Sequence, residues 1–213
     1  MRIVCISDTH ELHRDLVVPN GDMLIHAGDF TFFSKRPSML HDFNRWLGEL
    51  PHRYKVVVPG NHEYLLEVLR NRGAISNAIL LIDAGVEIEG VKIWGSPGTP
   101  LYGGAFGMSN PEDRKKRWAQ IPTDIEILIS HGPAYGILDG PPESEEHEGD
   151  RELLEALKRV QPILHICGHV HAGYGTRKRG KTYHINAAQF DESLGGLERD
   201  PIVVDFEALK RSR

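Results

Sequence analysis

Five short apolar runs in this chain are each followed within three residues by Asp, Asn or His. The runs cover residues 3–6, 23–27, 55–58, 125–129 and 163–167, and their length and composition predict buried strands. Amphipathic helical patterns separate several of these runs. In open α/β sheets, the carboxyl ends of the strands line the crevice where ligands bind. We therefore expect the polar residues behind the runs to converge on one site.

The remaining segments complete an α/β pattern. Helices are predicted over residues 38–50, 63–70, 112–119 and 151–160, the third with Asn110 as N-cap and Pro111 at its first position. Further strands are predicted over residues 79–82, 86–88, 91–94 and 202–206, and the stretch 95–107, rich in Gly and Pro, predicts a loop. Strands that alternate with helices early and cluster later favour an α/β (α+β) sandwich, formed by one domain over residues 1–213.

The polar residues behind the strands suit divalent metal ions. They are Asp8, His10, Asp29, Asn61, His131, His169 and His171. Imidazole nitrogen, together with carboxylate and amide oxygen, is a donor set for hard to borderline divalent ions. Two residues spaced i, i+2 beyond a strand end, such as Asp8 and His10 or His169 and His171, can both turn toward one cluster. Seven ligands exceed the number that one site with an open position uses, so two ions bridged by a carboxylate fit the count better.

Several of these polar residues also have a purely structural interpretation. Asn61 precedes a helical pattern and is interpreted either as its N-cap or as a metal ligand. His26 and His165 lie inside apolar runs and are interpreted as hydrogen-bonded core histidines. His13, which lies just beyond the first strand end, is interpreted as a solvated loop residue.

Charge and composition exclude some classes of protein. The net charge of −5 argues against a general nucleic-acid-binding surface. No apolar run approaches the roughly 20 residues that span a bilayer, and the N-terminus does not resemble a signal peptide. Cys5 and Cys167 lie inside apolar runs, which predicts buried, reduced thiols. We therefore expect a cytoplasmic protein without a membrane or stable nucleic-acid partner.

Three charged stretches are less informative. The basic residues 114–117 are interpreted as the solvated face of a helix. The basic residues between 177 and 181 are interpreted as a solvated hairpin tip around Gly180, although they could also meet an anionic substrate. The acidic loop 139–149 is interpreted either as a lid beside His131 or as a surface insertion.

As an ordered set, the motifs resemble those of the calcineurin-like metallophosphoesterase superfamily. The chain carries D-x-H at residues 8–10, G-D at 28–29, G-N-H-E at 60–63, S-H at 130–131 and G-H-x-H at 168–171. Phrases such as SDTH, HAGDF, VPGNHE and CGHVHAGYG are most similar to the small metallophosphoesterase-domain-containing phosphodiesterases. The resemblance implies a metallo-dependent phosphatase-like fold, a four-layer α-β-β-α sandwich of two mixed sheets flanked by helices.

The resemblance also implies a role for each motif residue. Seven residues would bind metal: Asp8, His10 and His171 on one ion, Asn61, His131 and His169 on the other, and Asp29 as the bridge. His62 would face the substrate as a catalytic residue and bind no metal. The two ions would be Mn²⁺ in the first place, with Fe, Zn, Co or Ni as alternatives. Some members of the subgroup lack one histidine of the last motif, whereas this chain keeps both.

The implied activity is hydrolysis of small phosphodiesters, especially 2′,3′- or 3′,5′-cyclic nucleotides, by in-line attack of a hydroxide that bridges the two ions. A phosphomonoesterase or phosphatase and a nuclease are alternatives on the same site. Phosphoprotein phosphatases of the superfamily carry an arginine soon after the G-D motif, whereas here Arg36 lies too far beyond Asp29. A noncatalytic interaction scaffold is the remaining alternative, and the intact ligand set counts against it.

Overall fold

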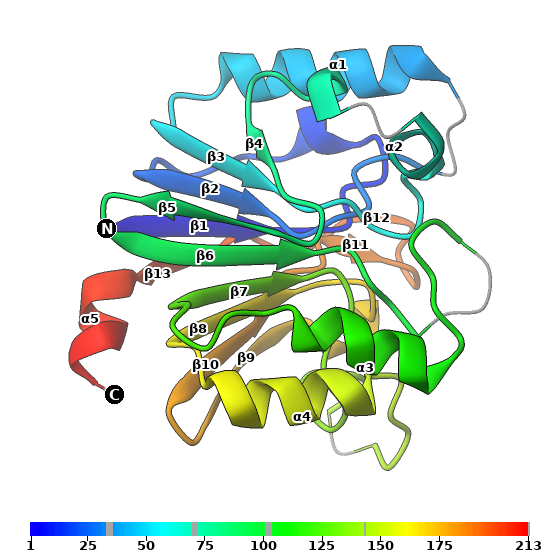
Figure 1. Ribbon diagram of the computed structural model, residues 1–213. Coiled ribbons are helices and arrows are strands. Elements are labelled where there is room, and N and C mark those ends of the chain that lie inside the picture. The colour runs from blue at the N-terminus through cyan, green and yellow to red at the C-terminus, as the bar shows by residue number, and fades with distance from the viewer. Residues whose placement is uncertain (33–35, 70–71, 101–103, 143, 213) are drawn as a thin grey trace.

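A computed structural model describes residues 1–32, 36–69, 72–100, 104–142 and 144–212. Two sheets lie at its centre (Figure 1). The first contains, in spatial order, β13 (Ile202–Asp205), β1 (Arg2–Ile6), β2 (Met23–His26), β3 (Tyr54–Val57) and β4 (Ile79–Leu80). The second contains β5 (Ala84–Ile88), β6 (Val91–Ser96), β7 (Ile127–Ser130), β8 (Leu164–Cys167), β10 (Thr182–Asn186) and β9 (Gly175–Arg179). A small ribbon pairs β11 (Phe190–Asp191) with β12 (Gly196–Leu197).

Both sheets are mixed. In the first sheet, β1 to β4 run parallel and β13 pairs with β1 in the antiparallel sense. In the second, β6, β7, β8 and β10 run parallel, and the edge strands β5 and β9 are antiparallel to their neighbours. In each sheet, the carboxyl ends of the central parallel strands therefore lie at the same end of the sheet.

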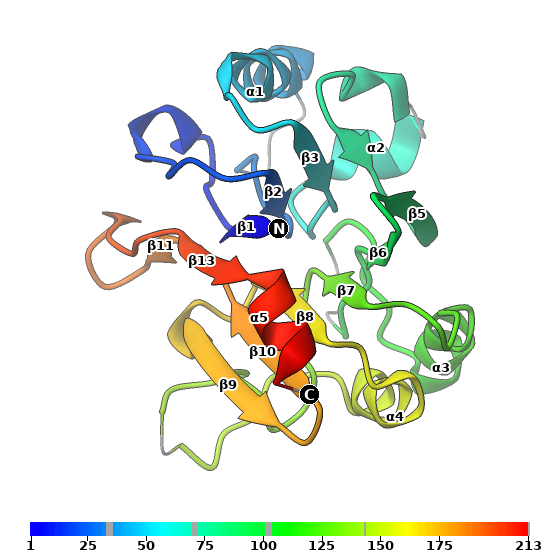
Figure 2. The ribbon, with the colours of Figure 1, turned by 90° about the vertical axis from the view of Figure 1, so that its left-hand side faces the viewer.

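Apolar side chains join the elements into four layers. Because alternate residues of a strand point to opposite faces, Ile3 faces the second sheet while Val4 faces the helical layer. The core between the sheets combines residues of both, such as Ile3 and Ile166. Helix α1 (Pro37–Glu49) covers the outer face of the first sheet, and α3 (Pro111–Ala119) and α4 (Arg151–Val160) cover that of the second (Figures 1 and 2). The expected α-β-β-α sandwich is confirmed.

The predicted helix boundaries agree closely with the structure. Asn110 caps α3 by accepting the backbone N–H of Glu112, and Pro111 is the first residue of this helix. Helix α2 (Tyr64–Leu69) begins one residue later than expected. Position 70 of its predicted range and positions 101–103 of the predicted loop lie outside the described residues. The expected last strand ends at Asp205, whose carboxylate caps an unpredicted helix, α5 (Phe206–Arg211).

Two interpretations of polar residues are wrong. His13 is only 1% exposed, because it packs against Trp46 and its Nε2 lies 3.1 Å from Asp42 Oδ2. Arg114 does not belong to a solvated helix face: it is buried, and its Nε donates to Asp150 Oδ1 at 3.1 Å. In both cases the partner comes from a distant segment of the chain.

Other predictions are confirmed. Cys5 and Cys167 are buried free thiols. The basic segment lies at the tip of the hairpin of β9 and β10, with Gly180 in the turn at a φ of 60°. No helix among the described residues is long and apolar enough to cross a membrane.

Candidate metal centre

The turns behind the strands place the motif residues on strained backbone. Asp8, His10, Asp29 and His169 have φ values of 54°, 42°, 54° and 68°, in the left-handed region that residues with a Cβ rarely adopt. Backbone hydrogen bonds hold the first two turns together, because the N–H of Asp8 donates to Gly28 O and that of His10 to Asp29 O. This strain is retained where several strand ends must meet at one point.

Two glycines in these turns are required by close approach. A Cβ on Gly60 would collide with Oδ1 of Asp29, and a Cβ on Gly168 would collide with Oδ2 of Asp8. The glycines of the G-N-H-E and G-H-x-H motifs therefore let the backbone pass directly beside the two carboxylates.

Asp8, His10 and His171 form a first cluster. Their potential ligand atoms all lie within 4.8 Å of one another. His171 Nε2 is 3.4 Å from His10 Nε2 and 3.3 Å from Asp8 Oδ1. The backbone N–H of His169 donates to both oxygens of Asp8, at 3.1 and 3.0 Å, and so orients this carboxylate.

Asp29, His131 and His169 form a second cluster, which Asn61 joins. His131 Nε2 lies 2.9 Å from Asn61 Oδ1 and 3.3 Å from Asp29 Oδ2. His131 Nδ1 is 2.9 Å from the carbonyl oxygen of Ala27, which can only accept, so Nδ1 carries a proton. In a neutral ring, Nε2 then presents a lone pair to two further acceptor oxygens. Such a convergence of acceptors fits a cation, and this donor set therefore suits a divalent metal ion.

Asp29 lies between the two clusters. It shares the second cluster with His131 and His169, and another potential ligand group with His10 and His62. The backbone N–H of His62 donates to Asp29 Oδ1 at 2.9 Å. The seven predicted ligands are thus brought together, and this carboxylate is the member that reaches both sides.

The pKa values of the clustered side chains also indicate a site that favours positive charge. Burial works to raise the pKa of Asp8, but the surrounding histidines, His171 first, lower it well below its usual range. Burial alone would lower the pKa of His131, yet the Asp29 carboxylate raises it to about 9. Burial and the charge of His131 lower the pKa of His169 to about 4. Without a metal, one proton held by His131 partly neutralises the carboxylates.

His62 lies beside the clusters as predicted. Its side chain is 10% exposed, and its Nε2 is 3.7 Å from Asp29 Oδ2. Its ring centroid lies 4.8 Å from that of His10 and 5.6 Å from that of Phe32. His62 therefore borders the cavity and the carboxylate at the same time.

The alternative interpretations are also decided by the structure. Helix α2 begins at Tyr64 and the side chain of Asn61 points to His131, so Asn61 is not the N-cap of this helix. His26 is a core histidine, hydrogen-bonded to Thr9 Oγ1 at 3.0 Å and accepting the N–H of Gly28 at 3.2 Å. His165 is equally buried and bonded to Ser130 Oγ.

Glu63 is a site residue for which the sequence motifs predicted no role. Its buried carboxylate accepts hydrogen bonds from the backbone N–H groups of Asp29, Gly60 and Thr31 and from the Thr31 hydroxyl, at 2.6–2.9 Å. It fastens the turn that carries Asp29 to the turn that carries Asn61. The signal was the acidic fourth position of the G-N-H-E motif.

A cavity of about 540 Å³ opens over the clusters. Phe32 and Phe190 line it, with ring centroids 5.5 and 5.3 Å from that of His10. Glu148 and Glu192 also line it, whereas no Lys or Arg does so among the described residues. Glu192 Oε1 lies 3.3 Å from His171 Nδ1. No sequence pattern distinguished these four wall residues.

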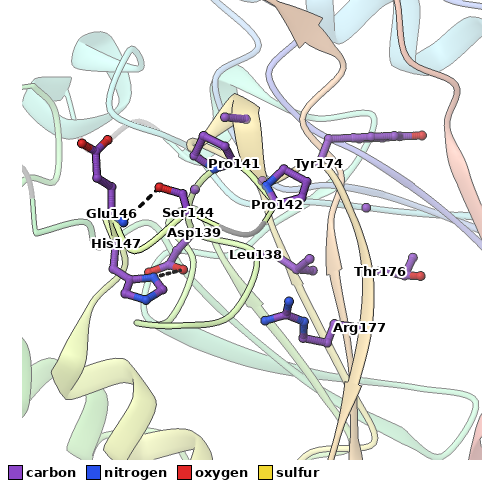
Figure 3. Close-up of a pocket in the computed structure, with 14 residues that line it drawn as sticks. Leu138, Asp139, Pro141, Pro142, Ser144, Glu146, His147, Tyr174, Thr176 and Arg177 are labelled. Atoms are coloured by element: carbon purple, nitrogen blue, oxygen red, sulfur yellow. Dashed lines mark hydrogen bonds and ion pairs between the residues drawn. The ribbon is translucent and has the colours of Figure 1, made fainter.

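The acidic loop separates this cavity from a second one. Asp139 holds the loop by accepting the N–H groups of Gly136 and Gly149 and by contacting His147 Nδ1 at 3.0 Å. Glu148, which follows His147 in the loop, lines the cavity over the clusters. The second cavity, of about 290 Å³, lies between Pro141 and Pro142 of the loop and the segment of Tyr174 and Arg177 (Figure 3).

Comparison with known proteins agrees with this site. Residues 1–173 match the family of calcineurin-like phosphoesterases, and the chain belongs to this family of metal-dependent phosphoester hydrolases. The chain is 36% identical over 238 residues to metallophosphoesterase domain-containing protein 1 of Homo sapiens, covering 99% of this chain and 72% of that protein. A UPF0046 protein of Caenorhabditis elegans is 39% identical over 219 residues, covering 95% of this chain and 74% of that protein. A solved crystal structure with 16% identity shares the fold, with a TM-score of 0.63 over 96% of this chain and 98% of the other.

Proposed function

We propose that this chain is a dinuclear metal-dependent phosphodiesterase that hydrolyses small phosphodiesters, cyclic nucleotides among them. The observation that carries the proposal is the pair of acceptor clusters with Asp29 between them. Seven donor atoms of the proposed ligands suit two ions better than one: Asp8, His10 and His171 on the first, Asn61, His131 and His169 on the second, and Asp29 on both. Two such ions, when bound, lower the pKa of a shared water and hold the phosphoryl oxygens.

The chain's own residues would carry out the remaining steps. His62 borders the cavity and lies close to Asp29, so it is placed to donate a proton to the leaving oxygen or to stabilise charge on the phosphoryl group. Phe32 and Phe190 offer flat apolar walls on which an aromatic base can stack. Both contributions favour a nucleotide-like substrate.

The charge of the cavity wall supports a diester in preference to a monoester. Glu148 and Glu192 line the cavity, and no Lys or Arg among the described lining residues balances them. A phosphodiester carries one negative charge, whereas a phosphomonoester carries close to two at neutral pH. Repulsion by the two carboxylates therefore acts about twice as strongly on the monoester. A nucleic-acid polymer, with many phosphates, is disfavoured further.

Metal stoichiometry and a substrate panel test this proposal together. The chain is stripped with EDTA, dialysed and titrated with Mn²⁺ by calorimetry and elemental analysis, and close to two ions per chain are expected. Loaded protein is then assayed on bis-nitrophenyl phosphate, nitrophenyl phosphate and both types of cyclic nucleotide. A single bound ion would refute the dinuclear centre, and a higher kcat/KM for the monoester would refute the diester preference. Activity that persists after EDTA and dialysis would refute metal dependence, and with it the dinuclear centre.

A further inference from the structure

A third cavity lies at the opposite end of β10 from the metal centre. It has a volume of about 190 Å³ and lies between α4 and the β9–β10 turn. Leu154 and Leu157 of α4 form part of its apolar side, and Lys158, Arg179 and Lys181 line it with positive charge. The register that pairs Tyr183 with Leu164 and Asn186 with Cys167 places this turn at the end of the sheet away from His169.

Two of these cations are not neutralised by the chain. Lys158 pairs with Glu155 at 2.6 Å. Arg179 and Lys181 make no ion pair with any residue in the described part of the chain. In a chain with a net charge of −5, two unpaired cations on one small cavity point to an anionic ligand.

His184 adds a polar atom to the wall of the same cavity. The residue is 3% exposed and lines the cavity from β10. Its Nδ1 lies 3.1 Å from His165 Nδ1. Its other nitrogen, Nε2, has no hydrogen-bond partner in the ranges that the structure describes.

The proton positions in this histidine pair follow from the hydrogen bonds of Ser130. Ser130 Oγ has one proton, which it donates to Gly132 O at 2.7 Å, because a carbonyl oxygen can only accept. Ser130 Oγ therefore accepts from His165 Nε2 at 2.9 Å. Burial keeps His165 neutral by lowering its pKa, so its Nδ1 is bare and accepts from His184 Nδ1–H. Burial lowers the pKa of His184 to about 4, so this ring is neutral as well. Its Nε2 is then bare and can only accept from a ligand.

We propose that this cavity binds an oxyanion that keeps one O–H group, of which hydrogenphosphate is the simplest. The negative oxygens would pair with Arg179 and Lys181, and the O–H would donate to His184 Nε2. Sulfate has the same shape and charge but no proton at neutral pH, so it would leave His184 Nε2 facing an oxygen. An acceptor that the bound ion covers but leaves unpaired weakens binding about 10-fold or more.

Residue-resolved NMR separates this site from the metal centre, where phosphate can also bind. The full chain, labelled with ¹⁵N and loaded with diamagnetic Zn²⁺, is titrated with sodium phosphate and with sodium sulfate at constant ionic strength. Phosphate should shift the His184 Nε2 resonance in a saturable manner, and sulfate should bind about 10-fold more weakly or worse. The Arg179→Gln/Lys181→Gln double variant should weaken this phosphate binding by about 10-fold or more.

Lys178→Gln is the matched control, because Lys178 lies on the same strand but does not line the cavity and bonds to Ser212 O. It should bind phosphate as the wild type does. Three results would overturn the proposal: no saturable shift of His184, equal affinities for phosphate and sulfate, or unchanged binding in the double variant. Resonances of the metal-centre histidines report phosphate there independently, so loss of one site is not mistaken for loss of the other.

Discussion

Replacement of Glu63 by Gln tests the hydrogen-bond network beneath the proposed bridging carboxylate. One oxygen of Glu63 accepts the N–H groups of Asp29 and Gly60, and the other accepts the N–H and hydroxyl of Thr31. Burial, and then the neighbouring Asp29 carboxylate, raise the pKa of Glu63 above its usual range. Nevertheless, three N–H donors point at it, and a protonated carboxyl group would turn its own O–H toward one of these donors. We therefore expect the carboxylate to be ionised.

The magnitude follows from counting hydrogen bonds. A Gln side chain keeps one oxygen, so it preserves at most one of the two pairs of hydrogen bonds that the Glu63 oxygens accept. Its NH₂ group then faces two donors, and two hydrogen bonds to a charged acceptor are lost. At about 1.5–3 kcal/mol each, the free energy of unfolding should fall by roughly 3 kcal/mol or more. This is a large share of the roughly 5–15 kcal/mol typical of a domain.

Urea unfolding in EDTA measures this loss without the contribution of bound metal. Glu67→Gln is the matched control. Glu67 lies on α2, and within the described residues its side chain accepts only the N–H of Phe106, which an amide oxygen can also accept. Its stability should change by less than about 1 kcal/mol. If the Glu63→Gln variant is as stable as the wild type in EDTA, the carboxylate is not ionised, because an amide mimics only a protonated Glu63.

Four further outcomes are expected. Asp29→Ala should abolish activity and metal binding while the fold persists, whereas His26→Ala should chiefly lower stability, by about 2 kcal/mol or more; the reverse pattern would show that the G-D motif has been misassigned. His62→Ala should retain metal and impair cyclic nucleotides about 10²–10³-fold more than bis-nitrophenyl phosphate, since an alkoxide leaving group needs a proton; equal losses would reject the general acid. Glu192→Gln should raise kcat/KM for nitrophenyl phosphate more than for the diester, and an equal effect on both would reject charge selection. Burial lowers the pKa of His26 to about 3. As the pH falls through 6.5, His26 therefore gains a proton in the unfolded chain but not in the folded one. In EDTA, the free energy of unfolding should fall by about 2 kcal/mol between about pH 7.5 and pH 5 because of His26. An equal pH dependence of stability in His26→Gln would contradict this role of His26.

The proposed ligands could be found in the sequence because each lies within a few residues of the end of an apolar run. A buried strand is visible as a short apolar run, and the turn that follows must carry the polar residues that its conformation tolerates. Asp8 and His169 take up the left-handed backbone at such turns. The order of the motifs along the chain then identified the family before any distance was known.

The tertiary structure alone decided which distant groups meet. His13 is buried because Trp46 and Asp42 come from α1, and Arg114 because Asp150 lies 36 residues further along the chain. The sequence around His13 or Arg114 does not indicate these partners. The same holds for Phe190, which becomes a cavity wall only when its segment folds over His171.

The strands, most of the helices and the proposed metal ligands were therefore determined by the sequence itself, because periodicity and turn chemistry act within a few residues. The walls of the cavity, the carboxylate of Glu63 beneath Asp29 and the histidine pair of His165 and His184 were decided by packing. These features depend on the register of strands that are paired across long stretches of chain. A sheet register sets which side chains become neighbours, and only the folded chain specifies it.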